Sequence, residues 1–156
     1  MLPTMASLFS SATTWSCSTI PSLANKVYLV TGGTAGIGFG IVSNLLSHNP
    51  EKVYMLSQMP HHADLATQEL ERYGDPKKVE FVKCDLEDLK EVDETAKKLQ
   101  GKLERIDGLV CNAGIGVGVY NLSRDGIGWP PSPFPVTVLT SDQIHTSKST
   151  TSPKCT

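Results

Sequence analysis

The sequence predicts an α/β fold in which an open parallel β-sheet is covered by helices. Short apolar segments alternate with longer segments of helical periodicity, in the order strand, helix, strand, helix, strand, helix, strand. The first strand ends in a glycine-rich corner that leads directly into a helix. Because crossovers between parallel strands are right-handed, this order predicts the strand order 3-2-1-4. Such a sheet is one half of a doubly wound fold plus the first strand of the other half, and the fold is therefore expected to be incomplete.

The first strand and helix are predicted over residues 26–48. Residues 26–31 are a short apolar run that ends in Gly32-Gly33, which suits a buried parallel strand. Residues 36–48 carry an apolar stripe at helical spacing, made of Ile37, Ile41, Leu45 and Leu46. The pair Asn49-Pro50 ends this helix.

Two further strands flank a second helix. Residues 52–57 and 79–84 predict the strands, the latter from its alternation of apolar and polar residues. The helix is predicted over residues 62–73, and the Gly-Asp-Pro of residues 74–76 ends it. Its inner face is predicted to consist of Ala63, Ala66, Leu70 and Tyr73.

The third helix and the fourth strand complete the pattern. Residues 86–103 are rich in Glu and Lys, and acids crowd the first turn, as the helix dipole favours. The apolar residues that keep helical period are Leu86, Leu89, Val92, Ala96 and Leu99. Residues 106–111 predict the fourth strand.

The ordered domain is expected over residues 24–127, between a flexible N-terminal arm and a disordered C-terminal tail. Ten of the first 22 residues are Ser or Thr, and no charged residue precedes Lys26. A targeting peptide, the alternative for this arm, would need basic residues there. Residues 128–156 are rich in Pro, Ser and Thr and show no period, although residues 136–140 could pair as a short strand.

Composition excludes several function classes. A net charge of −2 gives no reason to expect a nucleic-acid or anionic-membrane partner. The four cysteines are far apart, which argues against a zinc site and a disulfide framework and favours a reducing, cytoplasmic location. No run of 18 apolar residues is present, so no membrane span is predicted.

The glycine-rich corner, residues 31–38, is the strongest functional signal. Gly32 permits a tight turn, Gly36 lets backbone N–H groups approach a phosphate, and Gly38 lets the following helix pack closely. The positive end of that helix then faces the anion. A glycine loop that merely packs is the alternative. The strand before the corner and the helix after it favour phosphate binding.

This corner resembles the coenzyme motif of the short-chain dehydrogenase/reductase family. The motif runs Thr-Gly, three residues, Gly, an apolar residue and Gly, and it is filled here by Thr31, Gly32, Gly36, Ile37 and Gly38. The resemblance covers residues 24–127. It implies a Rossmann-type fold, a bound nicotinamide dinucleotide and oxidoreductase activity.

Two further segments match the family. Asp85, with Leu86 beside it, stands where the family has an acid that hydrogen-bonds the adenine. The segment Cys111-Asn112-Ala113-Gly114 matches the family's Asn-Asn-Ala-Gly motif, with Cys in the first position. The residues that follow, through Tyr120-Asn121, resemble the retinol-dehydrogenase-like branch.

Each of these segments has a structural alternative. Asp85 could simply cap the following helix, because an Asp at an N-cap accepts otherwise unpaired N–H groups. Residues 112–114 could be only a turn that leaves a strand. Both duties are compatible with cofactor contact, and three motifs in register are more specific than one.

NADP is predicted as the cofactor, with NAD as the alternative. An NAD site usually has an acid at the end of the second strand to hold the ribose 2′-hydroxyl. Here that end is Ser57-Gln58, and Thr34, Ser57 and Gln58 could donate hydrogen bonds to a 2′-phosphate. No Arg follows the strand as it does in many NADP-dependent relatives. The pair His61-His62 would help only when charged, and a solvated His pair in a loop is its alternative.

The resemblance implies catalysis by a Ser and by a Tyr and a Lys four residues apart on one helix, beyond the fourth strand. No catalytic residue is assigned in this chain. Tyr73 and Lys77 have that spacing, but Gly74 and Pro76 break the helix that would align them. Tyr120 is followed at the same interval by Arg124.

The chain is therefore expected to be a truncated oxidoreductase, cut after the fourth strand by a frame change or a retained intron. A full-length form would act on a small-molecule alcohol or carbonyl. Two alternatives stay open, a non-catalytic dinucleotide-binding or regulatory module and an interaction module that pairs with a full-length relative.

Overall fold

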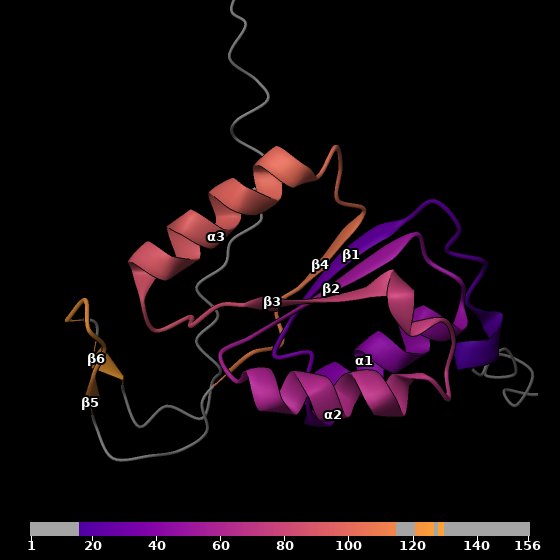
Figure 1. Ribbon diagram of the computed structural model, residues 1–156, viewed down its shortest axis with the longest axis horizontal. Helices are drawn as coiled ribbons and strands as arrows, with labels where there is room; N and C mark the ends of the chain where they lie inside the picture. Colours follow the sequence, from indigo (N-terminus) through magenta and orange to yellow (C-terminus); the bar gives the residue numbers. More distant parts are fainter. Residues whose placement is uncertain (1–15, 115–120, 127, 130–156) are drawn as a thin grey trace, which may run out of the picture.

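A computed structural model describes residues 16–114, 121–126 and 128–129 of the chain (Figure 1). The main sheet has four parallel strands in the order β3-β2-β1-β4, which confirms the predicted order. Its elements along the chain are β1 (Val27–Thr31), α1 (Gly36–Ser47), β2 (Lys52–Ser57), α2 (Pro60–Leu70), the short 3-10 helix η3 (Pro76–Lys78), β3 (Val79–Lys83), α3 (Leu89–Lys102) and β4 (Gly108–Val110).

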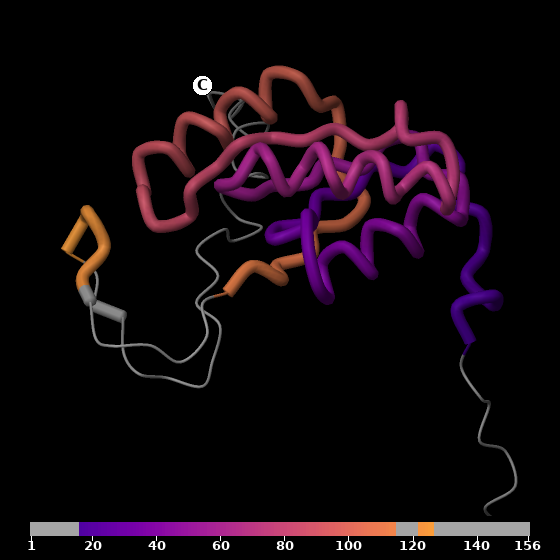
Figure 2. The backbone as a smooth tube through the Cα atoms, turned by 60° about the horizontal axis from the view of Figure 1, so that its bottom comes forward, coloured from indigo at the N-terminus to yellow at the C-terminus, as the bar shows by residue number. Residues whose placement is uncertain are grey.

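Helices cover both faces of this sheet (Figures 1 and 2), with α1 and α2 on one face and α3 on the other. On the α1–α2 face, the buried cluster consists of Val30, Val42, Leu46, Val53, Met55, Ala66 and Leu70. On the α3 face, it consists of Val27, Leu29, Tyr54, Leu56, Cys84, Val92 and Leu99. The strands β1 and β2 contribute side chains to both clusters. Because each fully buried aliphatic side chain contributes about 1.5–3 kcal/mol, these two central strands hold the sheet together. The carboxyl ends of the strands, where the motifs lie, are thereby fixed.

The apolar stripe predicted for α1 is partly wrong. Leu46 is buried, but the Ile37 side chain is 79% exposed and Val42 is buried instead. The reason is that Ile37 lies in the first helical turn, which projects past the carboxyl ends of the strands. There is no sheet beneath it to cover the side chain.

The ends of the second helix differ from the prediction. It begins at Pro60, which fits the first turn because that position needs no N–H donor, and it ends at Leu70. Tyr73 therefore lies beyond the helix and is 41% exposed, so its place on the inner face was wrong. His61 and His62 belong to the first turn of α2 and not to a loop.

The third helix begins later than predicted, at Leu89 and not at Leu86. Its N-cap is Asp88, whose carboxylate accepts hydrogen bonds from the backbone N–H groups of Lys90 (3.0 Å) and Glu91 (3.1 Å). The alternative in which Asp85 caps this helix is therefore wrong. The fourth strand is also shorter than predicted and spans Gly108–Val110.

The described parts of the two terminal segments contain secondary structure. In the predicted arm, Cys17–Thr19 form the short 3-10 helix η2, and Leu23 N–H donates to the His48 carbonyl (2.8 Å). A hairpin of β5 (Asn121–Leu122) and β6 (Gly128–Trp129) was not predicted. Residues 1–15, 115–120, 127 and 130–156 lie outside the described residues, and with them most of the predicted arm and tail, including the strand suggested for residues 136–140. None of the helices that the structure describes is both long and apolar enough to cross a bilayer.

Candidate dinucleotide-binding site

The glycine-rich corner joins β1 to α1 at the carboxyl edge of the sheet. Gly32 has a φ of +66° and Gly36 a φ of +55°, a backbone conformation that side chains with a Cβ rarely adopt. Gly32 N–H donates to the Leu56 carbonyl (2.8 Å), so the turn begins from a position fixed by β2. Nothing lies within 4 Å of the place where a Cβ on Gly36 would stand. The space beside Gly36 is therefore open.

Gly38 fixes the first turn of α1 against this corner. A Cβ added to Gly38 would overlap the Gly32 carbonyl oxygen and would lie 2.6 Å from Asn112 Nδ2. Such contacts are shorter than van der Waals packing permits, so only glycine lets the helix approach this closely. The close packing predicted for Gly38 is therefore against the corner and against Asn112.

A buried hydrogen-bond network joins the ends of β1 and β4. Thr31 is fully buried, and its Oγ1 accepts the backbone N–H groups of Asn112 and Ala113, each at 3.0 Å. Asn112 Nδ2 in turn donates to the carbonyls of Thr31 (3.2 Å) and Gly32 (3.4 Å). The structure thus brings together two motifs that are about 80 residues apart in sequence. Residues 112–114 do more than turn the chain, because they hold the glycine-rich corner in place.

The amino end of α1 fits an anionic group. Its N-cap is Ala35, which provides no side-chain acceptor, and its first turn contains no acid. The N–H groups of that turn therefore keep their capacity to bind an anion, and the positive end of the helix dipole adds to it. Thr34 is buried beside this turn, whereas Gly36 and Ile37 are exposed. A diphosphate is an acceptor that these groups can hold.

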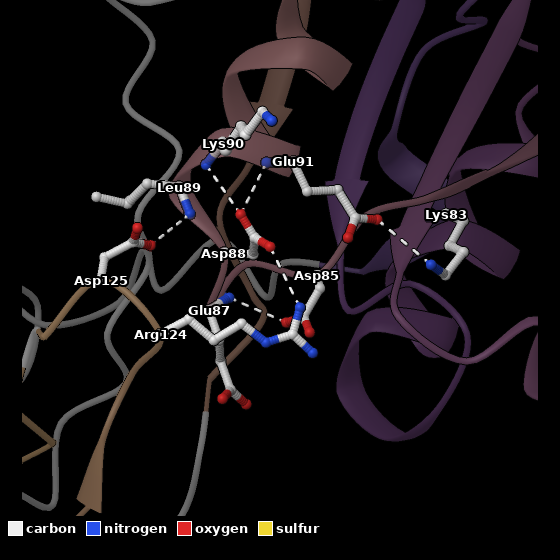
Figure 3. Close-up of polar contacts among 9 residues, drawn as sticks. All are labelled: Lys83, Asp85, Glu87, Asp88, Leu89, Lys90, Glu91, Arg124 and Asp125. Atoms are coloured by element: carbon white, nitrogen blue, oxygen red, sulfur yellow. Dashed lines mark hydrogen bonds and ion pairs between the residues drawn. The ribbon is translucent and has the colours of Figure 1, made fainter.

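Asp85 and Leu86 follow β3 at the same edge. Asp85 Oδ1 accepts the backbone N–H of Glu87 (3.0 Å), which fixes the turn between β3 and α3 (Figure 3). Leu86 is partly buried and packs against the cluster under α3. Asp85 is therefore held by its own turn, at the position that the resemblance assigns to the adenine.

Several charged residues that sequence reasoning missed surround this turn (Figure 3). Arg124 Nη1 lies 3.3 Å from Asp88 Oδ2, and the Asp125 carboxylate accepts the Leu89 N–H (2.8 Å). Hydrogen bonds from backbone N–H groups, first that of Glu91, lower the pKa of Asp88. Burial, and then the nearby Asp85 charge, raises the pKa of Glu87. The spacing Asp88-x-x-Glu91 is a capping signal that could have identified Asp88, but no local signal marks Arg124 or Asp125.

The end of β2 carries neutral side chains. Ser57 is partly buried and Gln58 is exposed, and Ser57 Oγ accepts the Met59 N–H (3.5 Å). Across the sheet, the Ser57 carbonyl accepts the Cys84 N–H (3.0 Å). In the first turn of α2 that follows, the His61 and His62 rings lie 4.2 Å apart. A negative group at this strand end would meet hydroxyl and amide side chains and no carboxylate from β2.

The Tyr-x-x-x-Lys spacing of Tyr73 and Lys77 does not form a catalytic pair. Tyr73 follows the end of α2 and contacts Phe39 edge to face, with 6.3 Å between ring centroids, whereas Lys77 lies in η3. Within the described residues, no helix carries a Tyr and a Lys four positions apart. At the family's first Asn position stands Cys111, and partial burial raises the pKa of its thiol. Within the same residues, no cluster of three or more His, Cys, Asp or Glu side chains is placed to hold a metal.

Comparison with known proteins decides the family. The model of the family described as short chain dehydrogenase matches residues 26–126, which include the glycine-rich corner, Asp85 and Asn112. The chain belongs to the short-chain dehydrogenase family.

Individual members show the same relationship. Short-chain dehydrogenase/reductase drtF of Aspergillus calidoustus is 43% identical over 107 residues, which are 69% of this chain and 34% of the relative. Mouse 15-hydroxyprostaglandin dehydrogenase [NAD(+)] is 36% identical over 90 residues, 58% of this chain and 33% of the enzyme. Among solved structures, the Pseudomonas aeruginosa RhlG/NADP active-site complex superposes with a TM-score of 0.53 at 32% identity. This superposition covers 61% of the present chain and 37% of the RhlG chain.

This short-chain dehydrogenase chain spans about a third of the length of the relatives it matches. The matched third contains the sheet, the glycine-rich corner and the strand ends beside it. Assignment to the retinol-dehydrogenase-like branch stays a prediction.

Proposed function

We propose that this chain binds NADP at the carboxyl edge of its sheet. The observation that carries the proposal is the glycine-rich corner, which is locked by Thr31 and Asn112 and which presents the uncapped first turn of α1 to open space. Positive φ at Gly32 and Gly36 and the close packing at Gly38 are the features a diphosphate site requires. An NADP complex among the related structures supports the same cofactor.

Different residues of the site would bind different parts of the cofactor. The N–H groups of residues 36–38 would hold the diphosphate, with Thr34 beside them. Asp85, with Leu86, would bind the adenine, and residues 112–114 would line the nicotinamide side of the corner. Ser57 and Gln58 would face the ribose 2′-phosphate. When bound, NADP supplies or accepts a hydride, and the chain's own part is to bind and orient it.

The whole protein, we infer, reduces a carbonyl or oxidises an alcohol on a small molecule. Family membership supports this reaction class. We infer further that the residues the structure describes provide the cofactor half of that reaction and not its catalytic Ser, Tyr and Lys, since among them Tyr73 and Lys77 are not aligned on one helix. The cytoplasmic location stays a prediction.

The experiment is a fluorescence titration of the full chain with NADPH and NADH, together with the Ser57→Asp and Ser57→Asn variants. We expect wild type to bind NADPH more tightly than NADH. Ser57→Asp should weaken NADPH binding by about tenfold or more, because a carboxylate would face the 2′-phosphate, and should strengthen NADH binding. Ser57→Asn introduces a neutral side chain of the same size as that of Asp, and this variant should keep the wild-type preference for NADPH.

Absence of binding to either dinucleotide by folded chain would refute the proposed function. Binding of both with equal affinity, unchanged by Ser57→Asp, would refute the assignment of the 2′-phosphate to the end of β2.

A further inference from the structure

Lys83 stands beside the end of β2 although it is distant from it in sequence. The parallel register pairs Ser57 with Lys83, the last residues of β2 and β3. The hydrogen bond from Cys84 N–H to the Ser57 carbonyl (3.0 Å) extends the pairing past both residues. Neighbouring strands lie about 5 Å apart, and residues in register point to the same side of a sheet. The Lys83 side chain therefore starts beside Ser57, and its ammonium group reaches Glu91 of α3.

The Lys83 ammonium group is held only loosely. Its ion pair with Glu91 has an Nζ–Oε1 distance of 3.6 Å, and the Lys83 side chain is 60% exposed (Figure 3). An exposed pair at this distance contributes little, and its lysine can change partner at low cost. A phosphate with about two negative charges is the stronger partner for an ammonium group.

We propose that Lys83 binds the 2′-phosphate of NADP and makes this chain select NADP over NAD. This inference rests on the proposed function and adds to it a cation, which the carboxyl end of β2 lacks. Lys83 exchanges Glu91 for the phosphate when the cofactor binds. Glu91 competes with the phosphate for Lys83 and so moderates the affinity.

The test measures NADPH and NADH binding by fluorescence for the full chain and for Lys83→Gln and Glu91→Gln. Loss of one charge-assisted hydrogen bond should weaken NADPH binding about tenfold in Lys83→Gln, with NADH binding within about twofold of wild type. Glu91→Gln frees Lys83 and should strengthen NADPH binding about two- to fivefold, again without effect on NADH. Calorimetry with 2′,5′-ADP and 5′-AMP should repeat the pattern on the adenosine half alone.

The matched control is Lys97→Gln, which removes the same charge from an exposed ion pair with Asp93 on α3. It should leave the preference for NADPH unchanged. Opposite effects from the two members of the Lys83–Glu91 pair exclude a purely structural role, because loss of the pair's stability would act in the same direction in both.

Two results would overturn the inference alone: NADPH binding unchanged in Lys83→Gln, or equal losses for NADPH and NADH. An effect of Lys97→Gln equal to that of Lys83→Gln would also overturn it, because net charge would then explain the result. If wild-type chain binds neither dinucleotide, the proposed function fails and this inference fails with it.

Discussion

The side chain that most directly ties the two sequence motifs together is Thr31. Its hydroxyl accepts two backbone N–H groups from the segment after β4, and it is fully buried. A methyl group in its place would leave both donors without this partner. At the scale of single residues, the Thr31 hydroxyl oxygen is therefore one of the atoms that hold the corner to the segment after β4.

Replacing Thr31 tests this dependence. Thr31→Val keeps the side-chain volume but removes the acceptor, and we expect the free energy of unfolding to fall by about 1–3 kcal/mol. Thr31→Ser keeps the oxygen and should lose much less. Urea denaturation followed by circular dichroism measures both variants. Equal losses in the two would mean that the methyl group, and not the hydroxyl, matters.

Two glycines on the same helix give a second prediction. A Cβ on Gly38 would collide with the Gly32 carbonyl and Asn112, whereas a Cβ on Gly40 meets nothing within 4 Å. Gly38→Ala should destabilise the chain by about 1–3 kcal/mol, and Gly40→Ala should stabilise it by up to about 1 kcal/mol through helix propensity. Thermal unfolding of the pair measures the contrast. A tolerated Gly38→Ala would show that the helix need not approach the corner so closely.

Helices and strands were predicted well in kind and less well at their ends. The strand and helix periods of the sequence suffice for the elements from β1 to β4, because alternation and apolar stripes are local properties. Helix ends depend on which side chain provides the cap: Asp85 was the candidate for α3, whereas its N-cap is Asp88. Burial depends on how far an element extends past the sheet, which is why Ile37 is exposed despite its place in an apolar stripe.

One acid joins β1 and β4 at their amino ends. Asp107 accepts a hydrogen bond from Lys26 Nζ (2.9 Å) and another from Val27 N–H (2.9 Å). These contacts, the one with Lys26 first, lower the pKa of Asp107 below its ordinary 3.8. A carboxyl whose pKa is lowered by folding stabilises the fold above its ordinary pKa. That stabilisation is lost as the pH falls through the lowered value.

This sign predicts a pH-dependent difference between wild type and Asp107→Asn. At about pH 6 the variant should melt at a lower temperature, and the difference should shrink only as the pH falls below 3.8, through the lowered pKa at which the wild-type carboxyl becomes protonated. Melting temperatures from circular dichroism across this range provide the test. A constant difference at every pH would show that the charge on Asp107 does not contribute.

In the whole molecule, residues that are far apart in the sequence meet at one edge of the sheet. The strand order and the meeting of the glycine-rich corner with Asn112 could be predicted, because parallel connectivity fixes which strand ends are neighbours. The contacts of Arg124 with Asp88 and of Asp125 with Leu89 could not, since they depend on the path of the chain after β4. The pairing of Lys83 with Ser57 could not be predicted either, because it depends on the register of the strands and not only on their order.

The most direct test of the central claim is a titration of isotopically labelled chain with NADP, followed through its backbone amide NMR signals. If the corner holds the diphosphate, the amides of Gly36, Ile37 and Gly38 should shift with one common dissociation constant, while that of Lys97 on the outer side of α3 stays in place. Saturation of binding with unmoved signals at residues 36–38 would contradict the account, as would the absence of any shift at saturating NADP.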